Sequence, residues 1–306
     1  MGEAMAMQLR GRQASRMALA LDASDLEQLE ALSQPDARTF LLALAAHLAV
    51  WVLGVWLIAL AESRPALQAL VGLMMGSQLH ALTVLQHDCG HHSAFRSRNA
   101  NLWIGRLLAW FIVMPFTSFT ELHRLHHSHL GVQGRDPDSW FYAAGPRWSH
   151  WRECLFLPRF VWLSLVWPLS KQARVRVCVE LTANLLGHAL LLIGLFQWGR
   201  LDVAVFAIAL PMVALGCIFN PLARGAEHAP LAHLSADDPR RQDIRCNTVT
   251  VANRVWGLAW ANITYHVEHH LYPRVPFHRL PRLHAMLKAR DYLRTPSLLP
   301  FLRPPD

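Results

Sequence analysis

Charged side chains are scarce in this sequence. Asp, Glu, Lys and Arg make up only 16% of its 306 residues, whereas 53% are hydrophobic. A soluble domain usually carries about a quarter charged residues, so this chain lacks the polar surface that would let it face water on every side. The deficit predicts that much of the folded surface lies in a membrane.

Motifs of several protein classes are also missing. The five cysteines show no CxxC spacing, which argues against a zinc ribbon or a disulfide framework and favours a reducing compartment. The net charge of +8 is not gathered into a single basic run, and no nucleic-acid-binding motif is present. We therefore expect the basic residues to face anionic lipid or an acidic redox partner, and no nucleic acid as a partner.

Four apolar stretches are long enough to cross a bilayer. They are residues 41–60, 66–86, about 177–197 and 202–219. They pair into two helical hairpins, and Pro211 predicts a kink in the last stretch. Two weaker stretches, 102–119 and 154–169, contain Arg and Pro, and we interpret them as interfacial or re-entrant helices.

The distribution of Lys and Arg orients these stretches. Apart from Arg64 and Arg200 on the two hairpin tips, nearly all of them lie in the segments before, between and after the hairpins. The positive-inside rule therefore predicts that both termini and the central segment are cytoplasmic. A composition rich in Ala, Leu and Arg favours a bacterial cytoplasmic membrane. We predict a cytoplasmic N-terminal segment, residues 1–37, and one membrane domain, residues 38–306.

Histidine is unusually abundant, with 18 residues, and eight of them fall into three short boxes. The boxes are HDCGH with His87 and His91, HRLHH with His123, His126 and His127, and HVEHH with His266, His269 and His270. Positions i, i+3 and i+4 share one face of a helix, and neutral imidazole is a ligand for iron, copper or zinc. The fold predicted is an all-α membrane protein, with four transmembrane helices in two hairpins and a cytoplasmic helical cap that holds a di-metal site.

Acidic residues flank these boxes. A metal-bound histidine usually donates its other N–H to a carboxylate or a carbonyl group. The candidates for this role are Asp88, Asp136, Glu227 and Glu268. For any one of them, a solvated position on the surface is an equally good interpretation.

The boxes, in this order around two membrane hairpins, resemble the membrane-bound fatty-acid desaturase and hydroxylase superfamily. The phrases that carry the resemblance are LQHDCGHHSAF, ELHRLHHSHLG…DPDSW, ARGAEHAPL and NITYHVEHHLYPRVPFHRLP, and it extends over residues 40–285. It implies two non-haem iron ions with O₂ as co-substrate, and no catalytic side chain beyond the metal ligands. The ligands would be the eight box histidines and one lone histidine, for which His228 is the match.

Arg224 departs from the pattern of the well-studied acyl-CoA desaturases. In those enzymes an asparagine, one helical turn before the lone histidine, holds a metal-bound water. With arginine at this position, either the water is held differently or Arg224 contacts a substrate or a carboxylate. The departure puts the acyl-CoA substrate class in question.

The resemblance implies an O₂-dependent desaturase that introduces a double bond into a fatty-acyl or related aliphatic chain. Because the sequence has no Gly-rich dinucleotide fingerprint and no HPGG haem motif, electrons would come from a separate donor such as ferredoxin or cytochrome b5. A hydroxylase or ketolase of the same superfamily, acting on a carotenoid, another lipid or a small aliphatic metabolite, stays open. A metal transporter, whose polar ligands usually lie at mid-membrane depth, and a zinc hydrolase, with three or four protein ligands, are more remote.

Overall fold

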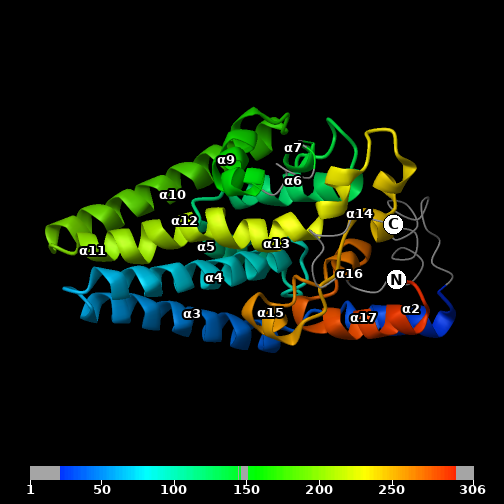
Figure 1. Cartoon of the computed structure of the whole chain (residues 1–306), viewed down its shortest axis with the longest axis horizontal. Helices are drawn as coiled ribbons and strands as arrows, with labels where there is room; N and C mark the ends of the chain where they lie inside the picture. The colour runs from blue at the N-terminus through cyan, green and yellow to red at the C-terminus, as the bar shows by residue number, and fades with distance from the viewer. Residues whose placement is uncertain (1–20, 144, 146–150, 294–306) are drawn as a thin grey trace.

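The computed structural model describes residues 21–143, 145 and 151–293, and in that part of the chain every regular element is a helix (Figure 1). The first elements are α2 (Ala23–Leu32), α3 (Ala37–Leu60), α4 (Pro65–Gly90), α5 (Arg98–Trp110), α6 (Phe116–His129), α7 (Ser139–Tyr142), η1 (Glu153–Leu155) and α9 (Phe156–Val166). Next come α10 (Lys171–Gln197), α11 (Leu201–Val203), η2 (Ala204–Ala209), α12 (Leu210–Ala214), η3 (Leu215–Phe219) and α13 (Asn220–Glu227). The last are η4 (Ala229–His233), η5 (Pro239–Gln242), α14 (Ile244–Asn247), α15 (Arg254–Ala259), α16 (His266–Leu271), η6 (Phe277–Arg279) and α17 (Leu280–Ala289). The all-α prediction is confirmed.

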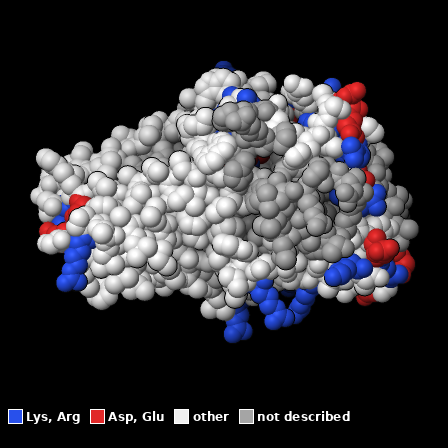
Figure 2. All heavy atoms as spheres, in the orientation of Figure 1, with Lys and Arg blue, Asp and Glu red and all other residues white. Residues whose placement is uncertain are grey.

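Four helices of the described chain are long and apolar enough to cross a membrane. They are α3, α4, α10 and the continuous run from α11 to α13, Leu201–Glu227. Leu60, Val179, Leu190 and Phe196 on their outer faces are each more than 60% exposed, which suits contact with lipid and not with water. Figure 2 shows an uncharged surface along these helices on the face in view, with charged side chains gathered towards the two ends.

One end of the four helices is held together by polar contacts. Arg200, in the turn between α10 and α11, donates to the Ala59 carbonyl oxygen of α3 at 3.2 Å and pairs with Asp202 at 2.8 Å. Gln68 of α4 donates to Asp202 at 2.8 Å and to the Ile58 carbonyl oxygen at 3.0 Å. These bonds connect α3, α4 and the α10–α11 turn at the end remote from the histidine boxes (Figure 1).

The long helices extend beyond the predicted apolar stretches. The run that contains Pro211 forms π-helical turns on both sides of that residue, in η2 and η3, where the proline cannot supply a backbone N–H. It then continues past residue 219 to Glu227, and α4 continues past residue 86 to Gly90. The apolar stretches end before the helices do because hydropathy falls as soon as polar side chains begin, while the helical hydrogen bonds continue. As a result, site residues lie on the ends of the long helices.

The weaker stretch at residues 102–119 is not one helix. It breaks between α5 and α6, where Val113 has a φ of +54° and Met114 donates to the Ala109 carbonyl oxygen. Leu85 of α4, Leu108 of α5 and Phe116 of α6 share one buried core. This packing places α6, with the second histidine box, beside the end of α4, which carries the first.

Candidate metal centre

Five histidine side chains meet where α4, α6 and α16 converge. We call His87, His91, His123, His127 and His269 the five-histidine cluster, and their ligand atoms all lie within 4.8 Å of one another. His123 Nε2 lies 3.0 Å from His91 Nε2 and 2.9 Å from His127 Nε2. Nitrogens bound to one cation at roughly 2.1 Å stand about 3 Å apart when they are at right angles. The spacing therefore fits a shared metal ion.

A second group lies beside the first, at the junction of α6, α13 and α16. His126, His228 and His270 have ligand atoms within 4.8 Å of one another. His266 joins them, because its Nε2 lies 3.2 Å from His228 Nε2 and 3.1 Å from His270 Nε2. We call these four residues the four-histidine cluster. The structure thus brings all nine predicted ligands together, five in one group and four in the other.

The state of the rings suits cation binding. Burial holds the pKa of His228, His266, His269 and His270 well below the usual 6.5, so the rings are neutral and present a lone pair. In the described chain neither ring nitrogen of the buried His87 has a hydrogen-bond partner. A buried imidazole with no partner is costly unless something binds it. Two metal ions fit these donor sets.

Two of the clustered rings are oriented by hydrogen bonds. His126 Nδ1 lies 2.9 Å from Asp136 Oδ1, and this fully buried carboxylate also accepts from the Gly131 and Asp138 N–H groups and from the Tyr142 hydroxyl. His228 Nδ1 lies 3.1 Å from Thr248 Oγ1. Since Nδ1 carries the proton in each ring, Nε2 is left with a lone pair that faces the cluster.

Asp88 and Glu268 have contacts other than those expected. Asp88 Oδ2 accepts from the Phe277 N–H at 2.9 Å, whereas Asp88 Oδ1 lies 3.9 Å from His87 Nδ1, too far for a hydrogen bond. Glu268 accepts from Thr250 Oγ1 and from His284 Nδ1, both at 2.5 Å. These two carboxylates join chain segments around the boxes and are not bonded to the clustered rings.

Arg224 contacts carboxylates, which is one of the roles that the sequence leaves open for this residue. Its Nη2 lies 2.9 Å from Asp138 Oδ2 and its Nε lies 3.3 Å from Glu153 Oε2. Burial raises the pKa of Glu153 to about 7, and the Arg224 guanidinium opposes that rise. Glu227, the last candidate, lies in the four-histidine cluster with Oε2 at 3.4 Å from His266 Nε2.

Sequence reasoning missed three residues around the site. Glu153 holds Arg224, Thr248 orients His228 and His284 holds Glu268. Glu153 directly precedes the weak apolar stretch 154–169. A carboxylate at the border of such a stretch is a signal that could have drawn attention to this residue. No spacing pattern connects Thr248 or His284 to the boxes, because their contacts depend on the tertiary fold.

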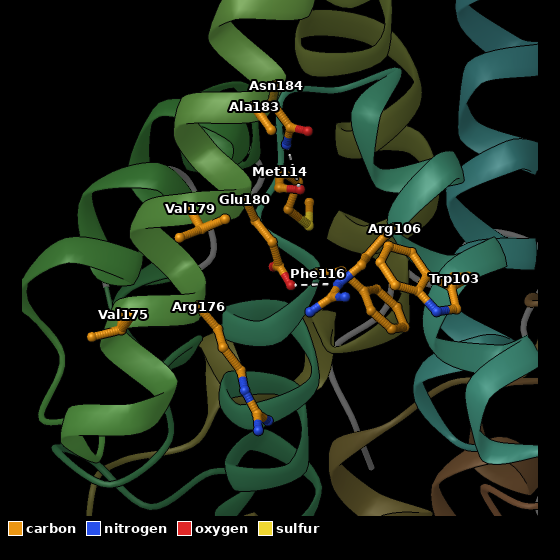
Figure 3. Close-up of a pocket in the computed structure, with 10 residues that line it drawn as sticks. All are labelled: Trp103, Arg106, Met114, Phe116, Val175, Arg176, Val179, Glu180, Ala183 and Asn184. Atoms are coloured by element: carbon orange, nitrogen blue, oxygen red, sulfur yellow. Dashed lines mark hydrogen bonds and ion pairs between the residues drawn. The ribbon is translucent and has the colours of Figure 1, made fainter.

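A cavity of about 330 Å³ opens between α5, α6 and α10 (Figure 3). Its charged lining includes Glu180, which accepts from Arg106 Nε, from the Thr117 N–H and from Thr117 Oγ1, each at 2.7 Å. Its apolar wall includes Val179 of α10 and Phe116 of α6. Phe116 stacks on Phe119 with the ring centroids 6.3 Å apart.

Phe119 connects the cavity wall to the histidine clusters. Its ring stacks on His123 of the five-histidine cluster, with the ring centroids 5.2 Å apart. Two stacked phenyl rings therefore separate the cavity from the clustered imidazoles.

The family model for fatty acid desaturase matches residues 63–299. The chain belongs to the fatty acid desaturase family. The predicted resemblance is therefore confirmed, and the protein is an oxidoreductase enzyme.

Named relatives of this desaturase act on several lipids. It is 27% identical over 254 residues to the sphingolipid delta(4)-desaturase/C4-monooxygenase of Rattus norvegicus, covering 73% of this chain and 71% of the relative. It is 30% identical over 227 residues to fatty acid desaturase 6 of Homo sapiens, covering 66% and 60%. It is 32% identical over 99 residues to the sn-1 acyl-lipid omega-3 desaturase (ferredoxin) of Synechocystis sp., covering 32% and 27%.

Proposed function

We propose that this desaturase is an integral membrane, O₂-dependent di-iron enzyme that introduces a double bond into a fatty-acyl or related aliphatic chain. The observation that carries the proposal is the grouping of nine histidines into two clusters at the ends of membrane-length helices. Their position at helix ends, and not at mid-span, also argues against transport of metal ions across the membrane.

The chain's own residues prepare the site for this chemistry. Bound iron would supply the oxidising power toward an unactivated C–H bond that no side chain has. Asp136 and Thr248 hold His126 and His228 in the tautomer with Nε2 free. Phe119 stacks on His123 and so presents an apolar ring to the five-histidine cluster.

The cavity of Figure 3 supports a lipid substrate that enters from the membrane. Arg176 of α10 lines it and is exposed, and no hydrogen bond or ion pair to its guanidinium group is found among the described residues. Glu180 is already matched by Arg106. We propose that Arg176 meets the polar end of the lipid, while the aliphatic part follows Val179 and Phe116 toward Phe119.

A hydroxylase is the second candidate. The names of the sphingolipid relatives couple a desaturase with a C4-monooxygenase, so both outcomes occur in proteins similar to this one. Removing a second hydrogen from the substrate gives an alkene, whereas adding oxygen gives an alcohol. The histidine set is compatible with either product.

The membrane orientation and the electron donor complete the proposal. We infer two hairpins with a helical cap on the cytoplasmic side of a bacterial membrane, with both termini in the cytoplasm. A separate donor such as ferredoxin or cytochrome b5 would dock on that basic face. The name of the Synechocystis relative, which includes ferredoxin, supports a donor of this class.

The proposal is tested by metal content and product analysis. We would purify the protein in detergent, load it anaerobically with Fe²⁺ and count metals by mass spectrometry, beside a His126→Ala, His269→Ala double variant that removes one ring from each cluster. About two irons per wild-type chain, lost in the variant, followed by a new double bond in supplied lipids, is the expected result. Absence of iron from the loaded wild-type protein, or one zinc untouched by the variant, would sink it.

A further inference from the structure

Glu227 reaches into the four-histidine cluster. It is the last residue of α13, directly before His228, and its side chain is only 8% exposed. Its Oε2 lies 3.4 Å from His266 Nε2. The carboxylate is therefore placed beside one ring nitrogen of the cluster and is largely shielded from solvent.

His266 Nε2 is surrounded by three atoms that carry lone pairs. They are His228 Nε2 at 3.2 Å, His270 Nε2 at 3.1 Å and Glu227 Oε2 at 3.4 Å. One ring N–H can serve only one of these atoms. A single cation that accepts a lone pair from each of them accounts for the whole arrangement.

Glu227 is also the flanking carboxylate with the fewest donors. Asp136, Glu268 and Asp88 each accept at least one hydrogen bond from an N–H or O–H group. No such bond to the Glu227 carboxylate is found in the described residues, and Arg224, one turn earlier on α13, is bonded to Asp138 and Glu153 instead. The charge of Arg224 acts on Glu227 without a hydrogen bond between them, so the carboxylate has a free lone pair for a bound cation, which would offset its loss of hydration directly.

We propose that Glu227 is a direct metal ligand, the fifth donor of the four-histidine cluster. The inference rests on the proposed di-iron function and goes beyond it. It makes the two metal positions chemically different, with five imidazole nitrogens at one and four nitrogens with an anionic oxygen at the other. Carboxylate is a harder donor than imidazole, so the second position stabilises the more oxidised state of a bound iron.

The test compares variants of Glu227 with a matched control. Glu227→Ala removes the ligand, Glu227→Asp retains a carboxylate, and Glu153→Gln alters another buried carboxylate that contacts Arg224 and not the clustered nitrogens. Each protein is purified whole, loaded with ⁵⁷Fe²⁺ without oxygen and examined by iron counting and Mössbauer spectroscopy. The spectroscopic readout is independent of enzyme activity.

In the wild type we expect two ferrous signals of equal area and different parameters. In Glu227→Ala one signal should shift or disappear while the other stays, with the affinity for that one iron about 100-fold lower or weaker still. Glu227→Asp should restore part of the lost signal, and Glu153→Gln should match the wild type.

Two irons with both signals unchanged in Glu227→Ala would overturn direct ligation and leave the di-iron function standing. A wild-type protein that binds no iron would overturn both. The partial recovery expected in Glu227→Asp separates ligation from a general disturbance of the fold, since that variant shortens the same side chain but keeps its carboxylate.

Discussion

The two histidine clusters share helices but differ in their surroundings. Around the five-histidine cluster the neighbours are rings, since Phe119 stacks on His123 at 5.2 Å and lies 6.1 Å from His87. Around the four-histidine cluster the neighbours are carboxylates, with Asp136 on His126 and Glu227 on His266. A metal ion at the first position would meet an apolar wall, and one at the second would meet negative charge. The two positions are therefore not interchangeable.

The largest effects should come from removing one ring from either cluster. His269→Ala and His270→Ala are neighbours in sequence but belong to different clusters, so each should lose one of the two irons and lower product formation by more than about 100-fold. Iron counting and Mössbauer spectra would show which signal is lost. Loss of the same signal from both variants would contradict the assignment of these two histidines to different clusters.

A smaller effect should follow from the charge on Asp136. Asp136→Asn keeps the shape but weakens the bond to His126 Nδ1, so iron affinity at the four-histidine cluster alone should fall about 10- to 100-fold. Competition with a chelator measures it. Glu268→Gln is the control, because it should lower the free energy of unfolding by about 1–3 kcal/mol and leave both affinities intact. Equal losses at both clusters would contradict the assignment of Asp136.

The pH dependence of the free energy of unfolding tests a property that both clusters share, the low pKa of buried histidines. In the folded protein burial keeps the pKa of His228, His266, His269 and His270 well below 6.5, while in the unfolded chain it returns to about 6.5. Below that pH the unfolded chain binds protons that the folded rings do not. The free energy of unfolding therefore keeps its full value above about pH 6.5 and decreases as the pH falls further. Melting of metal-free protein from pH 8 to 5 checks this. Iron-loaded protein should hold its Tm to lower pH, and a flat metal-free profile would refute the prediction.

The smallest effect concerns the cavity beside the five-histidine cluster. Arg176→Gln should raise the KM for a lipid with an anionic end by no more than about 5-fold, because an exposed charge contributes little, and should leave kcat and both iron signals unchanged. Lys171→Gln, an exposed residue of α10 outside the cavity lining, is the control. An identical change in KM for both variants would point to general surface charge and not to a site.

That the three boxes converge could be predicted from the sequence. The assignment of their histidines to two separate clusters was not part of that prediction. In each box the pair at i and i+4 serves one cluster, as His123 with His127 and His266 with His270 do, and in the second and third boxes the i+3 ring serves the other. Successive residues of a helix turn by about 100°, so i and i+4 differ by about 40° while i+3 and i+4 differ by about 100°. The helical geometry therefore points the i+3 ring in a different direction from the i+4 ring, and the tertiary fold determines which cluster each pair joins.

The contacts of the carboxylates were beyond sequence reasoning. Asp88 and Asp136 both lie near a histidine box, yet Asp136 holds His126 and Asp88 holds the Phe277 N–H, 189 residues away along the chain. Proximity in sequence does not determine which distant backbone N–H group the fold places beside a buried carboxylate. His228 was found through the family resemblance, because a lone histidine has no spacing of its own.

The polar contacts among Arg200, Asp202 and Gln68 fasten α3, α4 and the α10–α11 turn at one end of the long helices. Near the other end of α10, Glu180 accepts from Arg106 and from Thr117. A helix of 27 residues such as α10 is about 40 Å long at 1.5 Å per residue, so a tilt of about five degrees around one end would displace the opposite end by about 3.5 Å. A displacement of that size would break the bonds to Glu180. The contacts near both ends of α10 therefore fix the position of the cavity wall that faces Phe116.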